Sequence, residues 1–383
     1  MPDVNPENLR WARETAALSI EEAARKIGLT GLSAATRLRE IERGERVPTR
    51  TNLTKMAKAY HRPILALYVS QPPAKGARAH DLRTIRNDTT MAEAQLDAIV
   101  RNLRARQSLL RDALEDEDEA IAVSQIGAVS ANEGPAAIAN AILKATGFDL
   151  SQFRAQRTIE EAFAFARASV EKLGIYVLLI GDLGHFTTKL SQYVFRGISL
   201  PDPIVPFIVV NDNDSKSAWT FTLLHELAHL FIGESAISGY GSDVETERLC
   251  DDVAAQILLP YGDLETVGTH YDLFEAQIAE IGRASRGWKI SRKMVAYNLL
   301  RNGRISSLLY QQLSDRFDED RLEFVTSSGT SGSYFVTRTH RLGRSFIYTV
   351  DRMIASGALT TRKAAFVLGV KPTSVGRLTE GVR

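Results

Sequence analysis

One stretch of the chain is apolar around every side of a predicted helix. Between Phe221 and Phe231 most positions are leucine, phenylalanine or alanine. A helix that is apolar all round is buried in a core. Its titratable residues are His225, Glu226 and His229, and buried polar groups are costly unless they have partners. The pattern therefore predicts a core helix that carries a functional cluster.

The spacing within this helix, His225-Glu226-x-x-His229, is typical of a zinc site. Positions i and i+4 lie on one helix face, so both imidazoles can reach one ion. Glu226 follows the first histidine and can face a water that zinc acidifies, acting as general base. The alternative is a chance match to this pattern on an ordinary core helix.

A second helix is predicted to supply the third ligand. It runs from residue 242 to 259, with Ser242 or Asp243 as N-cap and Pro260 after its end. Glu247 lies on its apolar stripe, where a carboxylate needs a partner such as zinc. Glu245 faces nearer the polar side and is the second choice. The stripe consists of Cys250, Val253, Ala254, Ile257 and Leu258.

Further residues bear on this predicted site. Asp251, one turn after Glu247, can orient a ligand histidine, or it is a solvated surface carboxylate. Cys250, the only cysteine of the chain, is expected to be a small buried apolar residue. It would be a ligand only by displacing Glu247. Tyr240 and Tyr297 are candidates for stabilising an oxyanion, with a purely structural role as the alternative.

The first 70 residues predict a small helical domain. Ser19 and Glu22 form a capping box, and Gly28 and Gly44 follow helix ends. Helix, short glycine-bearing turn and helix make the helix-turn-helix pattern. The predicted helices span residues 9–17, 19–26 and 33–43, with further helices between 48 and 68.

The charge of this segment differs from that of the whole chain. It carries twelve Lys and Arg against eight Asp and Glu, a balance of +4, whereas the chain carries +1. Arginines near a recognition helix reach phosphates or guanine edges. The alternative is a solvated helix face with internal ion pairs, either Arg39 with Glu42 or Glu40 with Arg43. The candidate DNA-binding residues are Arg37, Arg39, Arg43 and Arg46.

The segment between these two regions predicts packing elements. A linker at residues 71–80 precedes a long amphipathic helix at 92–113, and another helix follows at 159–173. Short strands are predicted at 175–180, 193–200 and 207–210. Asp212 and Asp214 are assigned to a turn before the core helix rather than to a cation site.

The last part of the chain predicts two strands and a second small helix-turn-helix. The strands are expected at residues 322–325 and 334–337, and the helix pair at 360–378. This pair is basic, through Arg362, Lys363, Lys371, Arg377 and Arg383. Nucleic-acid contact and a packing or dimerisation role are both open for it.

Composition sets the class of protein. The chain has 383 residues, of which 44% are hydrophobic and 24% charged, as in ordinary globular proteins. No signal peptide and no apolar run long enough to span a membrane is evident, so a cytoplasmic location is expected. The fold class is α+β and mostly helical: an all-α helix-turn-helix domain followed by a zincin-like domain with a small sheet.

Two stretches resemble known families. The run from Ile41 to Thr49 resembles the end of the recognition helix in XRE-type regulators. The runs 195–198, 206–211, 221–229 and 247–260 resemble the ImmA/IrrE metallopeptidases. That family's third-ligand segment is Glu-x-x-Ala-Asn, and Glu247 to Asp251 aligns with it. Here Cys250 replaces the alanine and Asp251 the asparagine.

The resemblance implies a zinc endopeptidase that cleaves repressors, fused to a DNA-binding domain. The expected partners are duplex DNA and a repressor-like protein substrate, with no membrane and with a homodimer as the assembly. The expected division is 1–70 DNA binding, 71–149 linker and helices, 150–310 peptidase, and 311–383 of undetermined role. The alternatives are a transcription factor whose peptidase-like domain only senses a metal or ligand, and an antitoxin-like interaction protein.

Overall fold

The computed structural model describes residues 4–71, 91–183, 188–192, 194–234, 236–237, 244–268, 273–327 and 333–382. Contacts along the chain define two compact units, residues 1–103 and 104–383. The boundary falls inside the long helix α5 (Met91–Asp116). The predicted helix at 92–113 is thereby confirmed, whereas the predicted linker at 71–80 lies, except for its first residue, outside the described residues.

The first unit is a bundle of short helices. Ser19 caps the second helix and exchanges hydrogen bonds with Glu22, so the predicted capping box is confirmed. Leu9, Leu38 and Met56 meet in its core. The helices are α1 (Pro6–Glu14), α2 (Ile20–Lys26), α3 (Ala34–Glu42), α4 (Arg50–Ala59) and the 3-10 turn η1 (Ile64–Leu67).

The second unit contains a four-stranded mixed sheet in the order β1-β3-β2-β4. β1 pairs with β3 in parallel, and β2 is antiparallel to β3 and β4. The predicted strand at 207–210 matches β3, and the predictions at 175–180 and 193–200 contain β1 and β2. The strands are β1 (Tyr176–Leu179), β2 (Gly197–Leu200), β3 (Phe207–Val210) and β4 (Ala236–Ile237).

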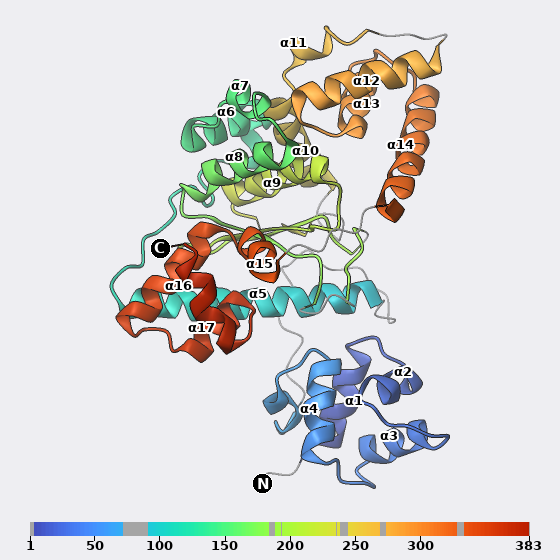
Figure 1. Cartoon of the computed structure of the whole chain (residues 1–383), viewed down its shortest axis with the longest axis vertical. Coiled ribbons are helices and arrows are strands. Elements are labelled where there is room, and N and C mark those ends of the chain that lie inside the picture. Colours follow the sequence, from blue (N-terminus) through green and yellow to red (C-terminus); the bar gives the residue numbers. More distant parts are fainter. Residues whose placement is uncertain are drawn as a thin grey trace. The chain divides into compact units, whose positions relative to one another are not determined.

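One group of helices covers the first face of this sheet (Figure 1). Val177 and Leu179 of β1 face this side and share a core with Leu223 and Leu227 of α9. The helices between residues 131 and 327 are η2 (Ala131–Glu133), α6 (Pro135–Thr146), α7 (Leu150–Arg154), α8 (Ile159–Glu171), α9 (Lys216–Ile232), α10 (Val244–Leu258), α11 (Tyr261–Leu264), α12 (Phe274–Trp288), α13 (Arg292–Arg301) and α14 (Ser307–Ser327).

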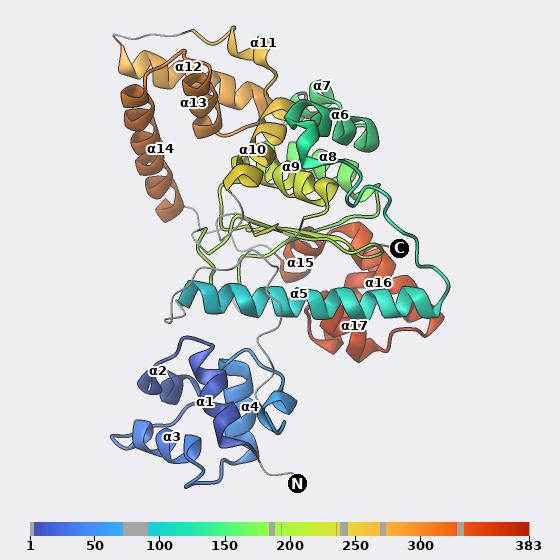
Figure 2. The same cartoon turned by 180° about the vertical axis from the view of Figure 1, so that it is seen from behind.

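The C-terminal helices lie on the opposite face of the sheet, as the view from behind shows (Figure 2). Tyr176 and Phe207 pack edge-on against Phe346 of α16. Gln107 of α5 donates hydrogen bonds to the carbonyls of Leu200 and Val205. All residues of β1, β2 and β3 are therefore buried. These helices are α15 (Tyr334–Leu342), α16 (Arg344–Ser356), α17 (Thr361–Leu368), η3 (Pro372–Ser374) and α18 (Val375–Glu380).

Two strand predictions are wrong. Residues 322–325 belong to α14 and residues 334–337 to α15. A short apolar run does not distinguish a strand from a helix. In α15 the less exposed positions are Phe335, Arg338, Thr339, Arg341 and Leu342, and all of them except Arg341 follow helical spacing. Arg338 occupies one of the inward positions of this helical repeat because its side chain binds carbonyl groups inside the unit. A search for apolar residues alone therefore misses the helical period.

The predicted fold class, α+β and mostly helical with a small sheet, is confirmed. Within the described residues, no helix combines the length and the apolar character that crossing a bilayer requires.

Candidate metal centre

The helix α9 holds both histidines and the glutamate of the sequence motif in the core. It runs along the sheet and beside α10 and ends at Gly233, whose φ of +79° is the left-handed conformation favoured by glycine. His225 is 4% exposed, and Glu226 and His229 are fully buried. The predicted apolar environment is confirmed.

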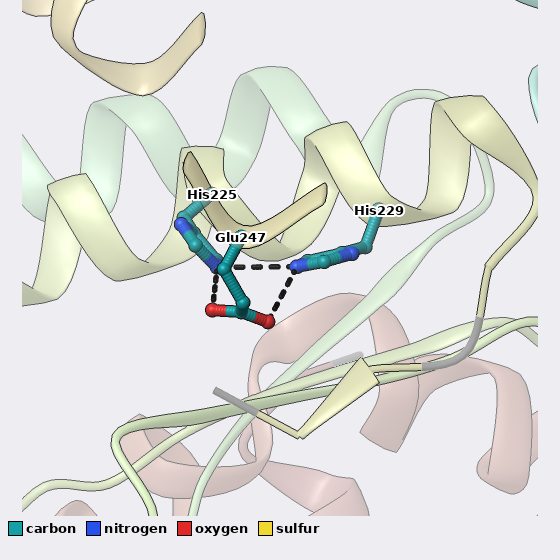
Figure 3. A group of neighbouring side chains, drawn as sticks. All are labelled: His225, His229 and Glu247. Atoms are coloured by element: carbon teal, nitrogen blue, oxygen red, sulfur yellow. Dashed lines mark hydrogen bonds and ion pairs between the residues drawn. The ribbon is translucent and has the colours of Figure 1, made fainter. Parts of the chain in front are cut away.

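Three potential ligand atoms converge between α9 and α10 (Figure 3). The Nε2 atoms of His225 and His229 are 3.1 Å apart. One Glu247 carboxylate oxygen lies 3.3 Å from His225 Nε2, and the other lies 3.3 Å from His229 Nε2. Among the described residues, His225, His229 and Glu247 bring their ligand atoms close enough together to hold a metal ion.

The spacing of these atoms suits a tetrahedral ion. With bonds of about 2.0–2.1 Å, two ligand atoms of a tetrahedral zinc site lie roughly 3.3–3.4 Å apart. The observed separations of 3.1 to 3.3 Å are close to this value. Two imidazoles and one carboxylate also match a known donor set of catalytic zinc. The residues therefore fit a metal ion.

The charge around the histidines also favours a cation. Burial alone lowers the pKa of His225, but hydrogen bonds with Asp251 and Glu247 and the charge of Glu226 outweigh it and raise this pKa to about 10. The carboxylates therefore stabilise positive charge at this position. A divalent cation supplies that charge while the imidazoles stay neutral.

Asp251 contacts one of the two histidines. Its Oδ1 lies 2.9 Å from His225 Nδ1. A hydrogen bond donated by Nδ1 leaves the Nε2 lone pair facing His229 and Glu247, which is how a carboxylate orients a metal-binding histidine. The Asp251 side chain is also 46% exposed, so it combines this contact with access to water.

Glu226 lies against the strand β2. A Cβ atom added to Gly197 would be 2.7 Å from both Cγ and Cδ of Glu226, well inside van der Waals contact. Only glycine leaves room for the carboxylate at this place. The sequence analysis assigned no role to Gly197, although a glycine inside a strand signals close approach of another group.

The other ligand candidates fare differently. Glu245 is exposed on α10 and lies outside the group of converging atoms. Burial, together with the charges of Glu226 and Glu247, raises the pKa of the Cys250 thiol far above its usual value, so Cys250 is a neutral core residue. Tyr240 and the N-cap candidates Ser242 and Asp243 lie outside the described residues.

A cavity of about 450 Å³ opens beside the metal-binding group. Tyr297 of α13 lines it together with His225 and Glu247, and its ring lies 5.9 Å from that of Tyr310. Arg196, the residue before Gly197, lies on the same wall. The cavity gives a ligand access to His225 and Glu247 beside Tyr297 of α13 and Tyr310 of α14.

The turn before α9 is structural. Asp212 forms an ion pair with Arg341, which also binds Asp182. The backbone N–H of Asp214 donates to the Asn211 carbonyl. The assignment of Asp212 and Asp214 to a turn rather than to a cation site agrees with these contacts.

The candidate DNA-binding arginines lie on and after α3 of the first unit. Arg39 pairs with Glu21, Arg43 with Glu45, and Arg46 with Glu40, and all three arginine side chains are 45% to 66% exposed. Ion pairs on an exposed face are thus present, as the alternative expects, but the example pairs of Arg39 with Glu42 and of Glu40 with Arg43 are wrong.

Glu42 is unavailable to Arg39 because it has another partner, and Arg37 is bound as well. Glu42 turns inward and binds Arg13 of α1 at 2.8 Å. Arg37 donates to the carbonyl of Thr30 in the turn before α3. The surface ion pairs of the remaining arginines hold them only weakly.

Comparison with known families agrees with this division of the chain into an N-terminal helical unit and a unit that carries the metal-binding group. A family model described as the IrrE N-terminal-like domain, a peptidase family, matches residues 170–300. A model described as helix-turn-helix matches residues 9–67. No curated protein and no solved structure matches the chain significantly. The chain thus combines an XRE-type helix-turn-helix domain with an IrrE-like domain of the metallopeptidase type.

Proposed function

We propose that this protein is a DNA-binding transcriptional regulator whose IrrE-like domain is a zinc-dependent endopeptidase, and that it cleaves a partner repressor protein. The observation that carries the proposal is the convergence of His225, His229 and Glu247 beside a buried Glu226. Nothing in a core requires two imidazoles and a carboxylate at such distances, and a cation makes the arrangement favourable.

Zinc suits these donors better than magnesium or calcium. Those ions prefer oxygen ligands, whereas two nitrogens and one carboxylate are typical of zinc. When bound, zinc acts as a Lewis acid that lowers the pKa of water and polarises a carbonyl group. His225, His229 and Glu247 would hold it, and Asp251 would keep His225 in the tautomer that presents Nε2.

Glu226 is the residue that moves the proton in this proposal. Its carboxylate accepts the proton of the attacking water and passes it to the amine that leaves the cleaved peptide bond. Contact with Gly197 fixes the carboxylate in place. The adjoining cavity receives the peptide, and Tyr297 on its wall offers a hydroxyl to the carbonyl oxygen on which negative charge develops.

In this proposal the first unit recognises the DNA site at which the protein acts. The helix α3 takes the position of a recognition helix, and Arg37, Arg39, Arg43 and Arg46 contact phosphates or base edges. A homodimer would bind two half-sites, because the symmetry of such operators mirrors that of the protein. The corresponding domains are residues 1–70 and 150–310, joined by 71–149 and followed by 311–383.

The substitution Glu226→Gln tests this proposal. Glutamine is nearly isosteric but cannot accept a proton, so the variant should keep zinc and retain its protein substrate uncleaved. Zinc-loaded Glu226→Gln is used as bait in an extract of the source cells, and each captured protein is incubated with the wild type and with the variant. The matched control is Glu245→Gln, an exposed position of α10.

Three outcomes separate the possible functions. Cleavage by wild type and by Glu245→Gln but not by Glu226→Gln supports the peptidase. Full zinc content without cleavage of any captured protein points to the metal or ligand sensor. A protein that binds neither zinc nor DNA points to the antitoxin-like module.

A further inference from the structure

The last 51 residues carry a strongly positive net charge. Residues 333–383 contain nine Lys and Arg against two acids, a balance of +7, whereas the complete chain carries +1. One of the two acids, Asp351, is buried. The surface of this segment is therefore more basic than that of the N-terminal domain, whose balance is +4.

The helices α16, α17 and α18 pack against one another within the second unit, and α16 also packs on the sheet through Phe346. Phe346 and Val350 of α16 are fully buried, as are Ala364 and Leu368 of α17, and Leu378 of α18 is 1% exposed. Each of the three helices contacts the other two. The arrangement is a three-helix bundle that leaves one face of α17 and α18 outward.

The connection between α17 and α18 is a short glycine turn. Gly369 ends α17 with a φ of +62°, and the N–H of Val370 donates to the carbonyl of Ala365. Three residues, 369–371, separate α17 from η3, which leads directly into α18. A turn of three or four residues that contains glycine joins the two helices of a helix-turn-helix.

Arg338 of α15 fixes this turn from behind. Its Nη2 donates to the carbonyls of Leu368, at 3.0 Å, and Gly369, at 2.6 Å. A Cβ at Gly369 would lie 2.8 Å from that nitrogen. Glycine is therefore required here both for the positive φ and for the close approach of Arg338. The angle between α17 and α18 is thus held by a dedicated contact.

The outward face of η3 and α18 is polar and small. Thr373 and Gly376 leave room for close approach, and Lys371 and Arg377 lie at its two ends. Arg377 stacks over the ring of Phe335, 4.3 Å from its centre, which positions the guanidinium. The exposed residues from 371 to 380 are Lys371, Pro372, Thr373, Gly376, Arg377 and Glu380.

The cations of the segment divide into an inner and an outer set. Arg338 and Arg341 bind backbone and carboxylates within the unit, and Arg352 pairs with Glu119. In the described part of the chain no ion pair is formed by the exposed Arg344, Arg362, Lys363 or Lys371. A phosphate backbone is a partner that would neutralise this outer set.

From these observations we propose that α16, α17 and α18 form a second helix-turn-helix, which binds duplex DNA through the outward face of residues 371–380 and the basic start of α17. The 3-10 turn η3 and the six-residue helix α18 that follows it directly present a helical segment that the major groove of B-DNA is wide enough to admit. Arg362 and Lys363 at the start of α17 would contact the phosphates beside the groove.

Charge favours DNA over a second copy of this segment. Two faces of this sign repel each other, and the large apolar residues of α17 and α18 are already buried. Phe366, 42% exposed, is the one large apolar side chain exposed between residues 360 and 380, too small a patch to hold a partner. Duplex RNA is also disfavoured, because its deep, narrow major groove excludes a helix.

The test compares full-length proteins, so that the two DNA-binding regions are separated. Lys371→Ala with Arg377→Ala is made in the wild type and in a protein whose N-terminal arginines are already changed, Arg43→Ala with Arg46→Ala. The control, Lys144→Ala with Arg157→Ala, removes two exposed charges from the opposite helical layer. Binding to a short labelled DNA duplex is followed by fluorescence anisotropy over a range of salt concentrations.

Loss of two phosphate contacts should lower the slope of log affinity against log salt by about 2. The C-terminal double variant should show this change in both backgrounds, the control should not, and Lys371→Arg with Arg377→Lys should restore the slope. Duplex RNA should bind more weakly than duplex DNA.

The proposal is overturned if the C-terminal variant behaves as the control does, or if it changes only the oligomeric state. Loss of binding in the Arg43 and Arg46 variant alone would concern the proposed N-terminal function and not this one. Thermal unfolding of each variant establishes that the fold is retained.

Discussion

Gly197 of β2 and the carboxylate of Glu226 on α9 occupy adjoining space, and a methyl group on this glycine would lie 2.7 Å from the carboxyl carbon. The strand thus sets the position of the side chain proposed as general base. The position of the Glu226 carboxylate therefore depends on its contact with the sheet and not only on the geometry of α9.

Gly197→Ala should therefore impair proteolysis without loss of metal. The nearest carboxylate oxygen of Glu226 must move by about 1 Å to reach ordinary contact with the new methyl group, and a misplacement of about 1 Å costs roughly 100-fold in rate. Overpacking should also lower the free energy of unfolding by about 1–3 kcal/mol. Cleavage rate, zinc content and thermal unfolding are measured together.

Gly262→Ala is the matched control, because a Cβ there meets nothing within 4 Å. Wild-type cleavage by Gly197→Ala would show that Glu226 tolerates displacement and is not the base.

The zinc content of the purified protein should be about one ion per chain and should be lost in His229→Ala and in Glu247→Ala. Both residues contribute atoms to the converging group, and removal of one donor of three leaves an incomplete site. Elemental analysis after dialysis against a weak chelator measures this. Glu245→Ala serves as control, and full occupancy in Glu247→Ala would move the third ligand elsewhere.

Asp251→Asn should weaken zinc binding while the protein remains folded. The hydrogen bond to His225 Nδ1 aligns the imidazole, and changes to such partners typically cost 10- to 100-fold in metal affinity. Competition with a chromophoric chelator gives the dissociation constant. Asp252→Asn removes the neighbouring charge, whose partner is Arg301 and not a histidine. Equal affinities in the two variants would leave Asp251 with no part in orienting His225.

Arg43→Ala with Arg46→Ala should weaken binding to the protein's own promoter DNA. The two guanidinium groups are at least half exposed and engaged only in surface ion pairs, so they are available to phosphates. The salt slope should fall by about 2, with zinc content unchanged. Arg10→Ala with Lys58→Ala removes the same charge from other helices of the unit. A response no larger than that of the control would assign phosphate contact to other residues.

Features encoded by neighbouring residues were predicted well. The Ser19 cap and the strand Phe207–Val210 follow from local pattern. The histidine pair follows from helix periodicity, because i and i+4 must share a face. Glu247 was reached by the same argument applied to α10, since a carboxylate on an apolar stripe lies near whatever that stripe covers.

Features that depend on contacts between distant residues were missed. The role of Gly197 requires the register of β2 against α9, which no local pattern contains. The helix α15 was misassigned because Arg338, an inward residue, is satisfied by carbonyls of the distant α17. Likewise, Glu42 binds Arg13 rather than the arginine beside it, because packing of α1 on α3 brings the two together.

The burial of the sheet on both faces limits how the IrrE-like domain can be exchanged between proteins. Phe207 and Tyr176 lose their cover if the segment containing Phe346 is removed. A piece ending at residue 310 would expose an apolar surface and aggregate. Recombination that transplants the IrrE-like domain into another protein must therefore carry the C-terminal helices with it, so this domain and the basic segment 333–383 are inherited together.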